Sequence, residues 1–190
     1  GSAFGLDAAG GVMAYLEEKR KGFDVVKTKI PHVPTAVIFD FGIGDFRVRP
    51  EREMGYQACL NASRKVAEGS VGVGTGATVG KLFGMERAMK GGIGTSSIHG
   101  PKGIIVGALV VVNAFGDVLD PLSHHILAGA RASRKGCQLA NSSKWMKRGV
   151  ARKQFGAITP SDSIAFNTTL GVVATNGYFS KKELRQIAQI

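Results

Sequence analysis

The segment 103–115 constrains the fold most, because it holds a nearly unbroken apolar run, IIVGALVVV, that contains no charge. A run of this length, rich in Val and Ile, is typical of a strand that is covered on both faces. We therefore expect this strand at the centre of the core. Asn113 follows the run, and a polar amide at the end of a buried strand is either a turn former or a positioned hydrogen-bond donor. The residues alone favour the turn.

Helical and strand patterns alternate along the rest of the chain, which predicts an α/β (α+β) fold. Apolar residues recur at helical spacing before Gly22 and over residues 51–68, so a helix is expected in each place. Ser180 and Glu183 form a capping box that predicts a C-terminal helix. Strands are expected over residues 23–27, 36–40, 89–98 and 168–175.

The composition predicts one globular domain over residues 1–190. Hydrophobic residues make up 44% of the chain and charged residues 21%, which is ordinary for a soluble protein. No apolar run approaches the roughly 20 residues of a membrane span, and the N-terminus does not resemble a signal peptide, which favours a cytoplasmic location without a membrane partner. Cys59 and Cys137 are too few for a disulfide framework or a metal cluster.

The net charge of +11 is concentrated in one region. Residues 121–161 contain no Asp or Glu, and the part from 131 to 161 is rich in Lys, Arg, Gly, Ser and Asn. We interpret residues 131–161 as a basic, exposed connecting segment. Its aromatic residues are only Trp145 and Phe155, too few for a base-stacking surface, so no nucleic-acid partner is expected.

A glycine-rich loop spans residues 72–81 and suggests a phosphate-binding loop. Thr75 stands where that motif requires its first Gly, and Leu82 where it requires a hydroxyl that binds magnesium. Nucleotide binding is therefore a weak alternative, although the glycines indicate tight turns or close approach of backbone. Lys81 is a candidate interior cation, whereas a lone Lys is more often solvated.

Asn167 and Thr168 stand directly before another apolar, β-branched run. Thr168 is either an ordinary strand residue or the nucleophile of an enzyme that cuts its own chain just before it.

Five motifs occur in one order along the chain: GSAFGLDAAGGVMAYLEE, VGVGTGATVGKLFG, MKGGIGTSS, VGALVVVNAFGDV and FNTTLGVVATN. Together they resemble the DmpA family of self-processing N-terminal-nucleophile hydrolases. That family includes L-aminopeptidase/D-esterases, β-peptidyl aminopeptidases and endo-type 6-aminohexanoate-oligomer (nylon) hydrolases. The Asn-Thr pair is most similar to the nylon-hydrolase-like members.

The resemblance implies an αββα sandwich of the DmpA/ornithine-acetyltransferase-like type. It also implies autocleavage between Asn167 and Thr168, catalysis by Thr168 with Asn113 and Lys81, a small peptide or amide substrate, no cofactor or metal, and a homotetramer. The chain is expected to be truncated at both ends, and Phe39 stands where some members have Tyr. The alternative within this fold is an inactive fragment or binding scaffold.

Overall fold

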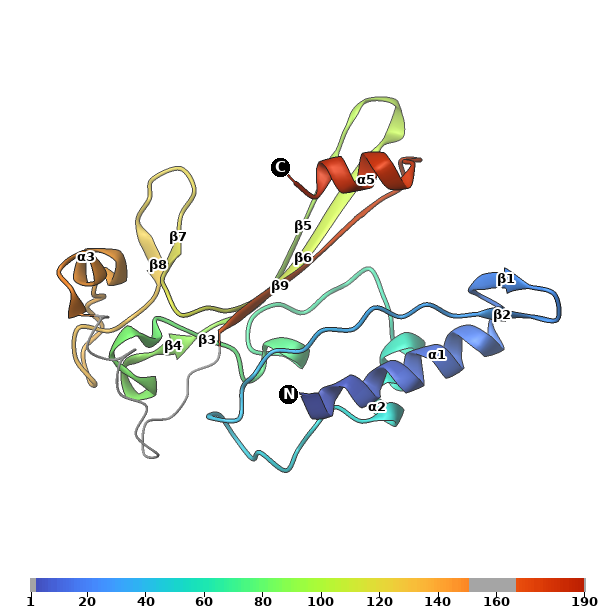
Figure 1. The fold of residues 1–190 in the computed structure, drawn as a ribbon. Coiled ribbons are helices and arrows are strands. Elements are labelled where there is room, and N and C mark those ends of the chain that lie inside the picture. Colours follow the sequence, from blue (N-terminus) through green and yellow to red (C-terminus); the bar gives the residue numbers. More distant parts are fainter. Residues whose placement is uncertain (1–2, 151–166, 190) are drawn as a thin grey trace.

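The computed structural model describes residues 3–150 and 167–189 (Figure 1). Its α-helices are α1 (Ala8–Glu18), α2 (Arg52–Leu60), α3 (Ser142–Lys147) and α5 (Lys181–Ile187). Its strands are β1 (Phe23–Val25), β2 (Thr28–Ile30), β3 (Thr78–Val79), β4 (Met89–Lys90), β5 (Gly92–His99), β6 (Ile105–Asn113), β7 (Val118–Leu119), β8 (Ile126–Ala128) and β9 (Thr168–Thr175). Helices and small antiparallel sheets are mixed, which confirms the α+β class. In the described residues no helix is long and apolar enough to cross a bilayer.

The largest sheet has the strand order β5-β6-β9, and Figure 1 shows its three long strands side by side. Both neighbours of β6 run antiparallel to it. The apolar run therefore forms the middle strand, as predicted. The register places Asn113, the last residue of β6, opposite Thr168, the first residue of β9.

The sheet is buried mainly at the Asn113 end of β6. There Ile38, Ala77 and Val111 form a buried cluster against which Leu170 packs. At the other end Val173 is 69% exposed and neighbouring side chains are exposed as well. The prediction that β6 is covered along its whole length was therefore wrong for the described residues. The helices α1 and α2 do not cover it, because they pack chiefly on each other.

Two glycines allow α1 and α2 to touch through their backbones (Figure 1). A Cβ atom on Gly11 would lie 1.8 Å from the carbonyl oxygen of Arg52, and one on Gly55 would lie 2.0 Å from that of Ala8. No side chain fits at either position, since real Cβ atoms do not approach backbone oxygen this closely. Gly11 and Gly55 are thus required by the packing of the two helices.

Several predicted elements differ from the structure. The strand expected over residues 89–98 is divided at Gly91 into β4, which pairs with β3, and β5, which pairs with β6. Residues 36–40 form no strand; the carbonyl of Phe39 accepts a hydrogen bond from the side chain of Asn113 rather than from a neighbouring strand. The predicted helix over 51–68 ends at Leu60. A turn at Asn61 and a bend at Arg64 follow, and Gly69 then pairs with Ile93 of β5.

We predict that Gly11→Ala in the full-length protein lowers the free energy of unfolding by about 2–3 kcal/mol, because the helices must separate to admit the methyl group. Urea denaturation measures this change. Gly10→Ala is the matched control in the same helix, since its Cβ would meet only the Arg52 side chain at 3.6 Å. That variant should be neutral or gain up to about 1 kcal/mol from helix propensity. Equal losses in both variants would contradict the backbone contact.

Candidate active site

The side chain of Asn113 joins three segments of the chain at the end of β6. Its Oδ1 accepts hydrogen bonds from Lys81 Nζ at 2.7 Å and from the backbone N–H of Thr78 at 3.1 Å. Its Nδ2 donates to the carbonyl oxygen of Phe39 at 2.8 Å. The residue is fully buried. Asn113 is thus a positioned hydrogen-bonding group in a strand, and the interpretation as a turn former was wrong.

Lys81 is brought to Asn113 by pairing between two loops. The backbone N–H groups of Gly80 and Lys81 donate to the carbonyls of Gly116 and Phe115, each at 2.8 Å. Gly80 has a φ of +70°, and a Cβ there would lie 1.9 Å from the backbone nitrogen of Ala130. Only glycine meets both conditions. The glycine-rich loop therefore serves close approach of backbone, as the sequence indicated.

The ammonium group of Lys81 lies in the interior. The residue is 4% exposed, and Nζ also donates to the backbone carbonyl of Asn113 at 3.1 Å. Burial disfavours the charged form and lowers the pKa of Lys81 from 10.5 to about 8. At neutral pH the group is therefore still mostly cationic, and its charge faces the Asn113 amide.

Thr168 lies across the strand pair from Asn113. Directly opposite residues of antiparallel strands project on the same face, with Cβ atoms about 5 Å apart. Thr168 is half-buried, and Asn167 before it is exposed. The structure thus brings Lys81 and Asn113 into contact, and it places Thr168, with Asn167 before it, opposite Asn113 on the neighbouring strand.

Two contributors were not predicted. Thr78 supplies a backbone N–H, and its hydroxyl lies 3.4 Å from Asn113 Oδ1. Phe39 supplies a carbonyl oxygen. The family resemblance drew attention to position 39 through its side chain, but backbone groups leave no signature in residue type, so no sequence signal pointed to these contacts.

The segment 131–161 is described only as far as residue 150. Within that part, α3 begins at Ser142, which is buried and donates from N and Oγ to Asp117, both at 2.7 Å. Asp117 also accepts from the backbone N–H of Ala130 at 3.1 Å. This carboxylate fixes the start of α3 beside the loop that backs Gly80. The remaining residues, 151–161, lie outside the described part.

The geometry gives no support to the nucleotide-binding alternative. A phosphate-binding lysine must reach the β- and γ-phosphates of a bound nucleotide. Lys81 is instead buried and donates to Asn113.

We predict that the free energy of unfolding of the protein, compared with that of a Lys81→Met variant, increases as the pH is raised. Lys81 titrates near pH 8 in the folded chain and near 10.5 when unfolded, so between these values the unfolded state binds more protons and raising the pH favours folding. Between pH 7 and 9.5 the difference in unfolding free energy should shift by about 2 kcal/mol in favour of lysine.

Both proteins should carry Thr168→Ala, so that only the uncleaved chain is compared. Urea denaturation at the two pH values provides the measurement. A difference that is flat or falls with pH would contradict the burial of an ammonium group at this position.

The model of peptidase family S58 matches residues 1–190. Proteins named as uncharacterized aminopeptidases from Mycobacterium bovis and Mycobacterium tuberculosis are each 40% identical to the chain, and one from Mycobacterium leprae is 39% identical. The matches cover 99% of this chain but 50–52% of the relatives, so the chain spans about half of their length. The chain belongs to peptidase family S58, the aminopeptidase family that its motifs indicated.

Proposed function

We propose that the protein is an amide hydrolase whose nucleophile is Thr168, released when the chain cleaves itself between Asn167 and Thr168. The observation that carries this proposal is the cross-strand pairing of Thr168 with Asn113, whose side chain is bonded to Lys81 at 2.7 Å. A hydroxyl, an amide and a buried cation then share one end of the sheet. These are the parts that acyl transfer by an N-terminal threonine needs.

Self-cleavage would begin with attack of Thr168 Oγ on the carbonyl carbon of Asn167. The C–N bond breaks, the nitrogen takes up a proton and becomes the α-amine of Thr168, and the acyl group passes to the hydroxyl oxygen as an ester. Water then hydrolyses the ester to the carboxylate of Asn167 and a free hydroxyl. The exposure of Asn167 supports access of that water.

The mature enzyme would use the α-amine of Thr168 as its base. An α-amine has a pKa near 8, so a large fraction is neutral at physiological pH and can take the proton of its own hydroxyl. The nearby cation of Lys81 would lower that pKa further, since like charges disfavour the protonated amine. The base would then be available at neutral pH without a histidine.

Asn113 would stabilise the oxyanion of the tetrahedral intermediate. One of its two Nδ2 hydrogens bonds to Phe39, and the other has no acceptor among the residues that the structure describes. A donor of this kind contributes on the order of 3 kcal/mol to the transition state. Lys81 and Thr78 hold the Oδ1 end, which fixes the direction of the N–H.

The substrate would be a small peptide or amide, in keeping with the family and the names of the relatives. The residues that line the substrate pocket decide among an α-peptide, a β-peptide and an amide oligomer of the nylon type. The homotetramer and the cytoplasmic location that the resemblance implied belong to this proposal as well. So do the single hydrolase domain and the role of residues 131–161 as a connecting segment.

We predict that Thr168→Ala abolishes cleavage of the full-length protein. Denaturing electrophoresis over time should show two fragments for the wild type and one band for the variant. Thr169→Ala is the matched control, because Thr169 lies opposite Val112 and projects from the other face of the sheet. It should cleave as the wild type does. A wild-type chain that stays whole would favour the inactive scaffold.

Removal of the Lys81 charge should move the acid limb of the pH profile of kcat/KM upward by roughly one unit, because the α-amine then keeps its proton more readily. Lys81→Met and the surface control Lys144→Met lose the same net charge. Steady-state rates on an amino-acid p-nitroanilide from pH 5 to 9 measure the shift. If the acid limb moves equally in both variants, or in neither, Lys81 does not lower the pKa of the Thr168 α-amine.

A further inference from the structure

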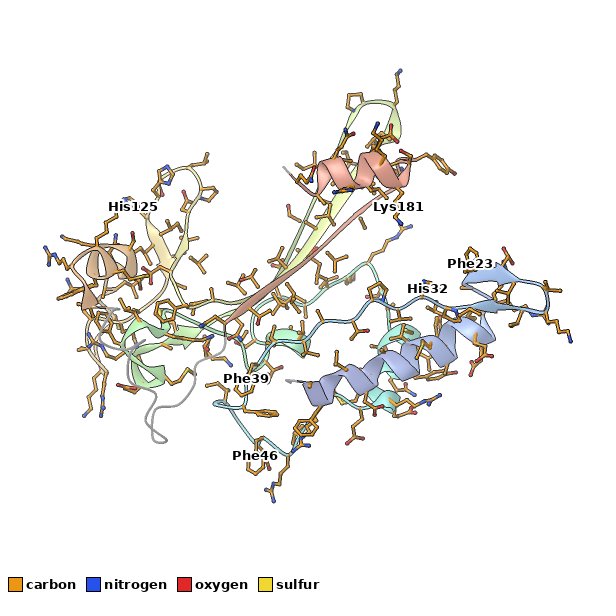
Figure 2. All side chains as sticks on the ribbon, in the orientation of Figure 1. Phe23, His32, Phe39, Phe46, His125 and Lys181 are labelled. Atoms are coloured by element: carbon orange, nitrogen blue, oxygen red, sulfur yellow. The ribbon has the colours of Figure 1, made fainter. Side chains whose placement is uncertain are left out.

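An aromatic ladder leads away from the candidate active site. We define it as Phe39, Phe41 and Phe4, whose ring centroids are separated by 5.1 Å and then by 6.2 Å. The ladder starts at the site, because the carbonyl oxygen of Phe39 accepts the hydrogen bond from Asn113. Figure 2 marks Phe39 near the start of β9, and Phe46 further out on the loop that follows. The outer rung, Phe4, is 54% exposed.

The guanidinium group of Arg49 lies at the outer end of this ladder. Its central carbon is 3.7 Å from the ring centroid of Phe4 and 6.0 Å from that of Phe41. Its Nε donates to the backbone carbonyl of Phe46 at 3.2 Å. Stacking and this hydrogen bond hold the plane of the guanidinium, so it is not a freely mobile surface side chain.

The charge of Arg49 is not neutralised by an acidic group in the described part of the chain. Two carboxylates lie near Arg49 on this loop. Asp45 is already bound by Arg47 through Nε and Nη2 at 3.0 and 2.8 Å, and Glu51 forms no ion pair with Arg49. None of the ion pairs between described residues includes Arg49. A fixed guanidinium that has no carboxylate partner among residues 3–150 and 167–189 is suited to bidentate binding of a carboxylate.

We propose that Arg49 and the aromatic ladder form a subsite for the free C-terminal carboxylate of a short apolar peptide. This inference rests on the proposed function, in which the scissile bond lies at Thr168. The Phe41 ring is 5.1 Å from that of Phe39 and 6.0 Å from the central carbon of Arg49, so the two ends lie within about 11 Å, the length of roughly three extended residues. The apolar side chains of the peptide pack against the rings, and its carboxylate meets the Nη atoms of Arg49. The preferred substrates are therefore peptides of about three residues with an unblocked C-terminus.

Equilibrium binding to the full-length protein tests the subsite without requiring hydrolysis. The probes are N-acetyl-trileucine with a free carboxylate and the same compound as its C-terminal amide, compared by calorimetry. The acid should bind the wild type at least tenfold more tightly than the amide. In Arg49→Gln the two should bind equally. Arg47→Gln, which removes a neighbouring cation that is already paired, should keep the preference.

Each outcome separates this inference from the proposed function. A wild type that cleaves itself but binds acid and amide equally would overturn the subsite and leave the hydrolase intact. A preference for the acid that depends on Arg49 would support the subsite even in a chain that never cleaves. A preference that survives in Arg49→Gln would also overturn it. If Arg49→Gln does not fold, Arg49→Lys takes its place in the test. This variant keeps the charge but not the planar fork, so it should lose part of the preference for the acid.

Discussion

The candidate site depends on one buried hydrogen bond, from the ammonium group of Lys81 to the side chain of Asn113. A lysine taken out of water needs acceptors, and Asn113 supplies two oxygen atoms at 2.7 and 3.1 Å. The same amide binds Thr78 and Phe39 on its other sides, so it ties a glycine-rich loop and an extended segment to the end of β6. The strand register then fixes Thr168 opposite this junction. The chemistry that we propose follows from that convergence, and no single residue would carry it.

Glycine makes the convergence possible. Gly80 combines a positive φ with backbone contact to Ala130, and the contact places the next residue, Lys81, over the end of the sheet. Gly11 and Gly55 likewise allow close backbone contact between α1 and α2, because each faces a carbonyl oxygen of the other helix. A chain with small side chains at these positions would hold its segments further apart, and the interior bonds of Lys81 would lose their geometry. These glycines have no side chain to pack, but they let two backbone segments come into direct contact.

Local patterns predicted much of the fold. The apolar run became β6, the run after Asn167 became β9, and Ser180 and Glu183 form the expected capping box. Patterns failed where long-range contacts decide the backbone, as for residues 36–40 and for the length of α2. The meeting of Lys81 with Asn113 could not be deduced from spacing and was implied only by family resemblance. The carbonyl of Phe39 and the stacking of Arg49 had no sequence signal, because one is a backbone group and the other depends on rings that are distant along the chain.

In the proposed mechanism Thr168 becomes a chain terminus and then carries the acyl group. Mass spectrometry of the full-length protein, digested after brief exposure to an amino-acid p-nitrophenyl ester, tests this most directly. We predict a peptide that begins TTLGVV at Thr168 and bears the added acyl mass on that first residue. A peptide that runs unbroken through Asn167 and Thr168, or an acyl group found on another residue, would contradict the account.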